Sequence, residues 1–179
     1  MTDAQTQAYL RDCLDYSPES GKFTWKTRPD EHFISPDRAR SWNTKFAGKV
    51  AGSTDGRGYR EIKINDRHLK AHRIAWILMN GVAPDQIDHI NGNRSDNRIS
   101  NLRNVTKAEN DRNRATSSAN TSGVMGVSWR KSASKWQAQI KIDRRTIHLG
   151  YFDDFHIAVA TRKRAERDYG FHRNHGRVA

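Results

Sequence analysis

The chain has 179 residues, with 32 lysines and arginines against 20 acidic residues, and its formal net charge of +12 favours a polyanionic partner such as nucleic acid. No apolar run approaches the roughly 20 residues that a membrane span needs, and the first residues lack the pattern of a signal peptide. The one cysteine, Cys13, excludes an internal disulfide. We therefore expect a cytoplasmic protein whose fold depends on its apolar cores.

The first part of the chain predicts short elements without chemistry of their own. Residues 9–14 are typical of a short helix, and residues 22–26 of a strand. Pro29 and Pro36 argue against regular structure between residues 27 and 45. We expect this region to form a layer that supports the segments after it.

A hairpin and a helix are expected next. Residues 59–64 and 67–70 predict two strands around a turn at Asn65-Asp66. Apolar residues then recur at helical spacing, and Gly81 is typical of a helix end. This order leads into the segment with the clearest chemical pattern.

A second pair of strands is predicted at residues 86–90 and 102–106, separated by turn residues rich in asparagine and glycine. Thr106 and Glu109 have the spacing of a capping box, which indicates a helix that runs to about Arg114. One turn into that helix, Asn110 could face the hairpin.

The residue types of this segment suit metal-assisted hydrolysis of a phosphodiester. That reaction needs a general base for water and a cation that neutralises charge on the phosphate. Asp88 and an asparagine carbonyl are suitable ligands for a hard ion, and an imidazole such as His89 ordinarily has a pKa close to neutral pH. Adjacent strand residues point to opposite faces, so we expect a twist or bulge to bring both side chains to one site.

The segment 71–114 resembles an HNH endonuclease of the ββα-metal fold, in the branch common among phage and homing enzymes. His89 matches the first histidine of the signature, Asn101 its central asparagine, and Asn110 its third position. The resemblance implies that His89 is the general base and that Asp88 and Asn110 bind the ion. It also implies that Asn101 braces the loop that carries His89.

The third signature position is usually histidine, and asparagine there implies Mg²⁺ or Mn²⁺ rather than an imidazole-rich zinc site. His72 and Arg73 are candidates for a phosphate contact, and a structural role is the alternative for His72. A lone Asp-His pair or an Asn-Gly turn carries little information. The prediction therefore depends on the combined spacing from His72 to Asn110.

Residues 115–122 contain no large apolar or charged residue and predict a linker. Residues 1–110 carry 18 basic and 14 acidic residues, whereas residues 111–179 carry 14 and 6. Beyond the linker we expect three strands and a helix, and then a basic tail at 171–179. The strands are predicted at residues 126–131, 135–142 and 145–152, and the helix at residues 154–169.

Alternation along the second of these strands predicts one apolar and one polar face. Trp129 and Trp136 fall on the apolar face and are expected in the core. The helix is expected to cover the same face through Ile157, Ala158, Ala165 and Tyr169. The polar face is rich in Arg, Lys, Gln and His, the side chains that meet base edges in a major groove.

Gly126-Val127, Trp136, Ala138, Ile140 and residues 149–152 resemble the APETALA/ethylene-response-factor DNA-binding domain. The resemblance implies contacts to bases and phosphates from six strand residues. They are Ser128, Arg130, Gln139, Lys141, Thr146 and His148. Several of the family's arginine and tryptophan contacts are replaced here, so its target sequence is not carried over.

Together these patterns predict an α+β protein. We expect an N-terminal ββα-metal HNH nuclease domain with supporting hairpins over residues 1–114, and a three-stranded antiparallel sheet packed on one helix over residues 123–170. The predicted function is site-selective hydrolysis of double-stranded DNA with one divalent ion, by a monomer if it nicks one strand, in a bacterial or phage-infected cell. A non-cleaving DNA-binding regulator that retains the HNH fold and an RNA-binding protein are the alternatives.

Overall fold

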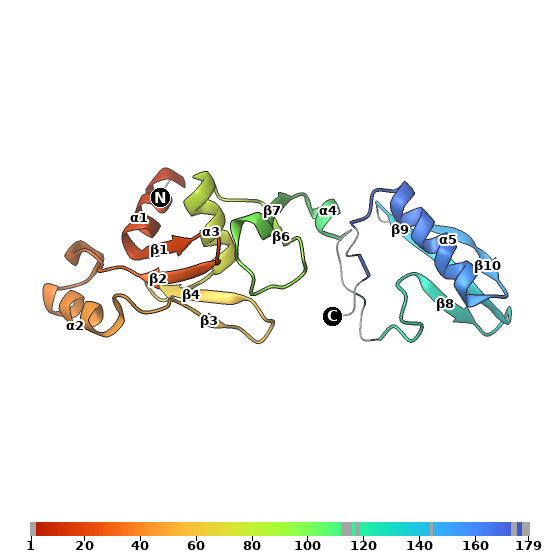
Figure 1. Cartoon of the computed structure of the whole chain (residues 1–179), viewed down its shortest axis with the longest axis horizontal. Coiled ribbons are helices and arrows are strands. Elements are labelled where there is room, and N and C mark those ends of the chain that lie inside the picture. The colour runs from red at the N-terminus through yellow and green to blue at the C-terminus, as the bar shows by residue number, and fades with distance from the viewer. Residues whose placement is uncertain (1–2, 112–115, 117–118, 144, 173–174, 177–179) are drawn as a thin grey trace. The chain divides into compact units, whose positions relative to one another are not determined.

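The structure, a computed structural model, describes residues 3–111, 116, 119–143, 145–172 and 175–176. The chain divides into two compact units, residues 1–104 and residues 105–179. Helices and strands contribute to both units, so the protein has a mixed α+β fold (Figure 1). Among the residues described, no helix is long and apolar enough to cross a membrane.

The first unit begins with helix α1, Asp3–Cys13, which runs directly into the hairpin of β1, Leu14–Ser17, and β2, Lys22–Trp25. The helix begins earlier than the predicted range 9–14. Gln7 contributes to this, because its Nε2 donates to the carbonyls of Ile77 and Leu78 at 3.0 and 3.1 Å. A contact far along the chain, which no local pattern reveals, therefore holds the polar start of α1.

The expectation of irregular structure between residues 27 and 45 is wrong. A 3-10 turn, Asp30–His32, is followed by the helix α2, Pro36–Phe46. Ser35 is its N-cap, and Pro36 stands in the first turn, where the missing N–H costs nothing. Pro36 therefore begins a helix instead of preventing one.

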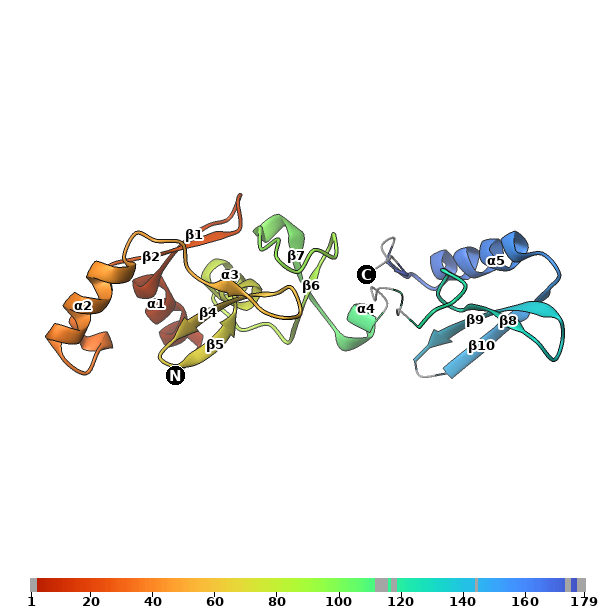
Figure 2. The ribbon, with the colours of Figure 1, turned by 90° about the horizontal axis from the view of Figure 1, so that it is seen from below.

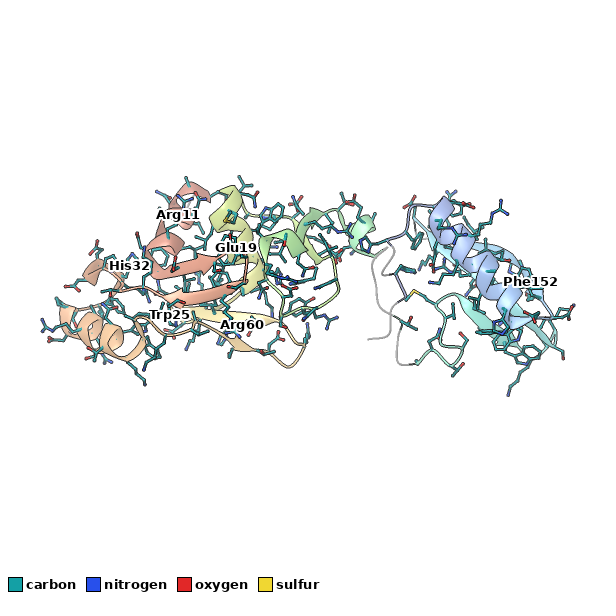
Figure 3. All side chains as sticks on the ribbon, in the orientation of Figure 1. Arg11, Glu19, Trp25, His32, Arg60 and Phe152 are labelled. Atoms are coloured by element: carbon teal, nitrogen blue, oxygen red, sulfur yellow. The ribbon has the colours of Figure 1, made fainter. Side chains whose placement is uncertain are left out.

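Aromatic side chains join α2 to the hairpin. Trp42 packs edge-on against Trp25 of β2, with 5.0 Å between ring centroids. Trp25 is labelled in Figure 3. The buried guanidinium of Arg28 lies over the rings of Trp42 and Phe33, at 5.0 and 4.7 Å from their centroids. These contacts fix a segment that has few aliphatic residues of its own.

A three-stranded antiparallel sheet and one helix form the centre of the first unit. The strands are β3, Ser53–Thr54, β4, Arg60–Ile64, and β5, Arg67–Lys70, in the order β3-β4-β5. Asn65 and Asp66 form the predicted turn, both with positive φ. Helix α3, Ala71–Asn80, follows and ends at the left-handed Gly81, as predicted.

The apolar core of this unit draws on all of these elements. Its buried residues include Leu10, Cys13, Phe23, Ile62, Ile74 and Leu78. Leu102 joins the same core from a two-stranded sheet formed by β6, Gln86–His89, and β7, Leu102–Val105. Both strands lie within one residue of their predicted ranges. The core therefore holds in place the strand that carries Asp88 and His89.

The second unit begins at the capping box that the sequence predicts. The backbone N–H of Thr106 donates to Glu109 Oε2 at 2.7 Å, and the N–H of Glu109 donates to Thr106 Oγ1 at 3.3 Å. These two hydrogen bonds cap the start of the short helix α4, Lys107–Asp111. Residues 112–114 of the predicted helix lie outside the described residues, as does most of the first half of the predicted linker.

The predicted three-stranded sheet with one helix is confirmed. The strands are β8, Val127–Arg130, β9, Lys135–Ile142, and β10, Arg145–Phe152, all antiparallel, in the order β10-β9-β8. Helix α5, Phe155–Asp168, lies along one face of this sheet (Figure 2). Val127, Ala138 and Ala158 are the buried residues of the core between them.

Three of the expected core residues are not in the core. Trp129 is 47% exposed, Ile157 56% and Tyr169 42%. Arg162 and Glu166 are buried instead, and their charged groups pair at 3.5 Å. They continue the stripe of Ala158 and Ala165 at helical spacing, so the charged residues, which a hydropathy pattern omits, lie on the inner face of α5.

The described part of the predicted basic tail is packed against this unit. His175 is buried, and its Nε2 lies 3.2 Å from Arg162 Nη2. Because guanidinium nitrogens only donate, His175 Nε2 is the acceptor. The Gly176 carbonyl accepts from Thr116 Oγ1 at 2.7 Å.

Candidate active site

Asp88 and His89 are the last two residues of β6, and both residues are buried, with 7% and 5% of the whole-residue surface exposed. Their surroundings differ. The Asp88 carboxylate meets a side chain of β7, whereas the His89 ring packs against α3 and the residue before β4. Strand alternation would place these neighbours on opposite faces, so the twist or bulge expected to bring both to one site stays a prediction.

An arginine holds the Asp88 carboxylate. Arg103 of β7 donates to Asp88 Oδ2 from both Nε, at 3.0 Å, and Nη2, at 2.6 Å. The Asp88 side chain is almost fully buried, while one third of the Arg103 side chain is exposed. The site therefore accommodates a positive charge at this carboxylate. Arg103 is not singled out by the sequence pattern, because the contact depends on how β6 and β7 lie together.

Two aromatic rings enclose His89. The His72 ring is nearly perpendicular to it, with 5.1 Å between centroids, and the Tyr59 ring lies at 6.0 Å. Burial lowers the pKa of His89, and the side chain of Asn97, followed by the carboxylates of Asp88 and Asp96, opposes that shift. Its buried Nε2 has no hydrogen-bond partner among the residues described. The lowered pKa favours the uncharged ring at neutral pH.

Of the two predicted phosphate contacts, His72 is buried and Arg73 is hydrogen-bonded to the backbone. Burial, followed by the positive charges nearby, lowers the pKa of His72 to about 3, so His72 carries no charge that would attract a phosphate. Arg73 Nη2 donates to the Pro84 carbonyl at 2.7 Å and fixes the chain just before β6. These contacts favour the structural alternative for His72 and give Arg73 a structural contact as well.

Asn101 connects both ends of the loop between β6 and β7. Its side-chain oxygen accepts from the N–H of Asn91 at 3.0 Å, and its Nδ2 donates to the Asp96 carbonyl at 2.9 Å. Its own carbonyl accepts from the N–H of Ile90 at 2.9 Å. The side chain is buried. This geometry is what a bracing residue requires.

An ion pair closes the same loop. Arg98 donates to Asp96 from Nε at 2.8 Å and from Nη2 at 2.6 Å, and Asn91 Nδ2 adds a third bond to that carboxylate. The hydrogen bond from Arg98 is the largest cause that lowers the pKa of Asp96 to about 2. The carboxylate therefore stays ionised and keeps the loop compact.

The β1–β2 hairpin contacts this loop. Tyr16 Oη donates to the Asn97 carbonyl at 2.7 Å, and the N–H of Ile99 donates to the Pro18 carbonyl at 3.1 Å. Gly21 has a φ of +69°, and a Cβ there would lie 2.5 Å from the backbone nitrogen of Arg98. The first layer therefore positions the loop after His89, a function the sequence analysis did not assign to it.

Gly21→Ala should destabilise the protein and disorder this loop. A positive φ costs alanine about 1 kcal/mol, and the clash with backbone adds about 1 to 3 kcal/mol. Gly48 is the matched control, because its φ is +78° and a Cβ there meets nothing within 4 Å. Urea unfolding should show a clearly larger loss for Gly21→Ala than for Gly48→Ala. Equal losses would mean that the hairpin does not press on the loop.

Two cations flank Tyr59 beside His89. The Arg94 guanidinium carbon lies 5.1 Å from the Tyr59 ring centroid, and Lys70 Nζ lies 5.3 Å from it. Lys70 is paired with Asp55 and Glu61. Arg94 forms no ion pair with any described residue, and its Nη1 donates to the carbonyl of Arg57. An exposed, uncompensated positive charge thus adjoins the aromatic wall of His89.

Asn110 belongs to the second unit. It lies in α4, and its N–H donates to the Thr106 carbonyl at 3.0 Å. The part proposed for Asn110 rests on its spacing from His89 and Asn101 in the sequence. No group of three or more His, Cys, Asp and Glu side chains within the described ranges is placed to hold a metal.

The oxygen donors expected at this site fit a hard ion by their chemistry. An ion such as Mg²⁺ keeps several waters and takes only one or two protein oxygens. Asp88 supplies such an oxygen, and its position against Arg103 shows that a cation is accepted there. The expected ligands are one carboxylate and amide carbonyls. Such a set contains fewer than three His, Cys, Asp or Glu side chains.

The strand register of the second unit places the six expected DNA contacts on one face. Thr146 pairs with Lys141 and His148 with Gln139, while Ser128 and Arg130 pair with residues of β9 that share this face. The structure adds two residues. Gln137 lies beside His148, at 3.2 Å between side-chain nitrogens, and the Tyr151 ring lies 4.6 Å from that of His148. α5 packs on the opposite face.

Residues 69–112 match the model of the HNH endonuclease family, so this segment is an HNH endonuclease domain. The match does not support the expected N-terminal placement of that domain over residues 1–114. The match covers 44 of the 179 residues and includes all four residues expected at the site. Protein 3.8 of Escherichia phage T7 is 37% identical to the chain over 73 residues. These make up 40% of this chain and 60% of that protein. No solved structure matches the chain.

Proposed function

We propose that the protein is a site-selective DNA endonuclease that hydrolyses one phosphodiester bond per active site with the help of a divalent ion. The observation that carries the proposal is the buried, uncharged imidazole of His89, whose Nε2 has no partner within the described structure. It stands next to the carboxylate of Asp88 in the segment that matches the HNH endonuclease family. A base and a cation ligand are thus adjacent in the chain.

His89 acts as the general base and takes a proton from the attacking water at Nε2. Asp88 and Asn110 hold the ion, with Asn110 assigned from its place in the signature. A bound Mg²⁺ or Mn²⁺ would neutralise the charge that develops on the phosphate and the leaving oxygen. Asn101 keeps the loop after His89 in place, because its side chain bonds to the start of that loop at Asn91 and to its middle at Asp96. The family resemblance implies products with 5′-phosphate and 3′-hydroxyl ends.

Arg94 is the candidate for holding the DNA backbone near His89. Its guanidinium lies over Tyr59, which contacts His89, and it is exposed and without an ion pair among the residues described. A planar guanidinium binds a phosphate through two donors. Arg73 is less suited to this role because its guanidinium already donates to the Pro84 carbonyl. His72 is less suited because burial lowers its pKa and keeps the ring neutral.

The C-terminal sheet supplies affinity for duplex DNA through the polar face opposite α5. The charge surplus of the second part of the chain and the resemblance to the APETALA/ethylene-response-factor domain support this assignment. Ser128, Arg130, Gln139, Lys141, Thr146 and His148 are the proposed contacts. The similarity to a phage protein supports a role in an infected bacterial cell, with a mobile gene of the homing type as its setting.

The competing function is a DNA-binding regulator that does not cleave, and Asp88, His89 and Asn110 argue against it because a regulator needs none of them. Incubation with supercoiled plasmid and Mg²⁺ separates the two. The endonuclease converts the plasmid to the nicked form, and the regulator only retards it on a gel. Tighter binding to structured RNA than to duplex DNA would favour the third alternative, an RNA-binding protein.

Neutralising Arg130 and Lys141 together should weaken DNA binding. If both contact phosphates, the slope of log affinity against log salt should flatten by up to about two units, because each contact releases about one counterion. If they contact bases, the preference for the target should fall by about 1 to 3 kcal/mol per contact. Fluorescence anisotropy with a labelled duplex at several salt concentrations measures both.

The control for this double variant is Arg164→Gln with Arg167→Gln. Both residues are exposed on α5, which covers the other face of the sheet, and their loss changes the net charge equally. The slope should stay near that of the wild type. An equal effect of the two double variants would show that net charge, not the polar face, binds DNA.

A further inference from the structure

We propose that Arg103 is a built-in counterion of Asp88 that competes with the divalent ion, so that it stabilises the metal-free site and weakens metal binding. This inference rests on the proposed function, because it takes Asp88 as a ligand of the ion. It assigns a positioning residue, and not a catalytic one, to a side chain that neither the HNH signature nor the sequence pattern singles out.

The contact is concentrated on one oxygen. Arg103 Nε and Nη2 both donate to Asp88 Oδ2, at 3.0 and 2.6 Å. Such charge-assisted bonds are among the stronger hydrogen bonds in proteins. A divalent ion that takes the same carboxylate therefore meets an oxygen that is already engaged.

Burial explains why a counterion is needed. The Asp88 side chain is 8% exposed, and a buried carboxylate without a positive partner is strongly unfavourable. Arg103 supplies that charge from the neighbouring strand, and one third of its side chain reaches solvent. The exposed part leaves the guanidinium room to shift when another cation binds to the carboxylate.

Two cations on one carboxylate oppose each other. The ion binds more weakly while the guanidinium is present, because like charges repel strongly at a site shielded from water. By thermodynamic linkage, the bound ion loosens the Arg103 contact to the same extent. Removal of Arg103 should therefore have two opposite effects, a less stable metal-free protein and a tighter metal site.

The test is calorimetric titration of the full-length, DNA-free protein with Mn²⁺, for the wild type and for Arg103→Gln. The dissociation constant should fall about fivefold or more in the variant, the usual range for a coupling between two sites. Arg103→Lys keeps the charge and should return the constant to within about twofold of the wild type. A constant that is unchanged or higher in Arg103→Gln overturns the proposal.

Arg98→Gln is the matched control. Arg98 forms an ion pair of the same length, 2.6 Å, with Asp96 in the same domain, and its loss removes the same charge. Its Mn²⁺ constant should stay within about twofold of the wild type. A fall equal to that of Arg103→Gln would show a general charge effect and would also overturn the proposal.

Thermal unfolding covers the case in which Arg103→Gln is unfolded without metal. Mn²⁺ should then restore its cooperative transition, and it should raise the melting temperature more than it does for the wild type. A variant that Mn²⁺ does not stabilise further contradicts the inference. Neither measurement depends on cleavage. If the protein nicks DNA but fails these tests, only the role proposed for Arg103 is rejected. If the wild type binds no Mn²⁺, both that role and the metal assignment are rejected.

Discussion

His89→Ala should abolish cleavage while its affinity for duplex DNA stays within a few-fold of the wild type. Loss of a general base removes a factor of about 100 to 10,000 in rate, because proton transfer from water is then unassisted. Few contacts to the ground state are lost, because His89 is buried between Tyr59 and His72. Single-turnover cleavage and anisotropy binding measure the two effects separately.

The control for His89→Ala is His68→Ala. His68 lies on β5, its side chain is 61% exposed, and it pairs only loosely with Glu61, at 3.5 Å. Its removal should leave the rate within about twofold, since exposed ion pairs contribute little. Normal turnover by a folded His89→Ala variant would remove His89 from the mechanism. Circular dichroism of both variants excludes loss of fold as the cause.

Asp88→Ala should raise the Mg²⁺ concentration needed for cleavage more than Asn110→Ala does. Asp88 supplies the only formal negative charge assigned to the ion, whereas an amide carbonyl offers a dipole. The variant also leaves Arg103 without its carboxylate, so it should lose stability as well. Mg²⁺ titrations of the initial cleavage rate, made alongside thermal unfolding, separate the two losses.

Asn101→Ala should act differently from Asp88→Ala. It removes the side-chain bonds to Asn91 and Asp96 of the loop, so it should lower the rate and the stability together and leave the Mg²⁺ requirement close to the wild type. The metal assignment is wrong if cleavage persists in EDTA. It is also wrong if neither Asp88→Ala nor Asn110→Ala changes the Mg²⁺ requirement.

Local pattern was sufficient for much of the fold. Three features depend only on residues close in sequence, through backbone conformation and local hydrogen bonds. They are the hairpin around Asn65-Asp66, the helix end at Gly81 and the capping box of Thr106 and Glu109. Strand alternation placed the six polar residues on one face, because the register keeps period two as far as His148; a β-bulge between His148 and Gly150 then brings Tyr151 opposite Gln137. These features need no knowledge of distant contacts.

The errors arose where position within an element or a distant partner decides the outcome. Pro36 was taken as a breaker, but proline at the start of a helix is compatible with it. Trp129 was expected in the core, but it lies on the edge strand β8 and is half exposed. Arg162 occupies the inner face of α5, where hydropathy predicts an apolar residue.

The candidate site was predictable only in part for the same reason. The signature spacing singles out Asp88, His89 and Asn101, which lie close in sequence. Arg103 and Tyr59 acquire their roles through the pairing of β6 with β7 and the packing against α3, which the spacing does not contain. Gly21 contacts a loop residue, Arg98, that lies more than 70 positions later in the sequence. A glycine is needed there because a Cβ would clash with the backbone of Arg98.

The most direct test of the central claim is the conversion of supercoiled plasmid to the nicked form by the full-length protein, followed over time with Mg²⁺ and with EDTA. The account predicts nicking by the wild type in Mg²⁺ and none in EDTA. It also predicts loss of nicking in His89→Ala at equal occupancy of the DNA. Plasmid that stays supercoiled with bound wild-type protein and Mg²⁺, or that is nicked equally by His89→Ala, would contradict it.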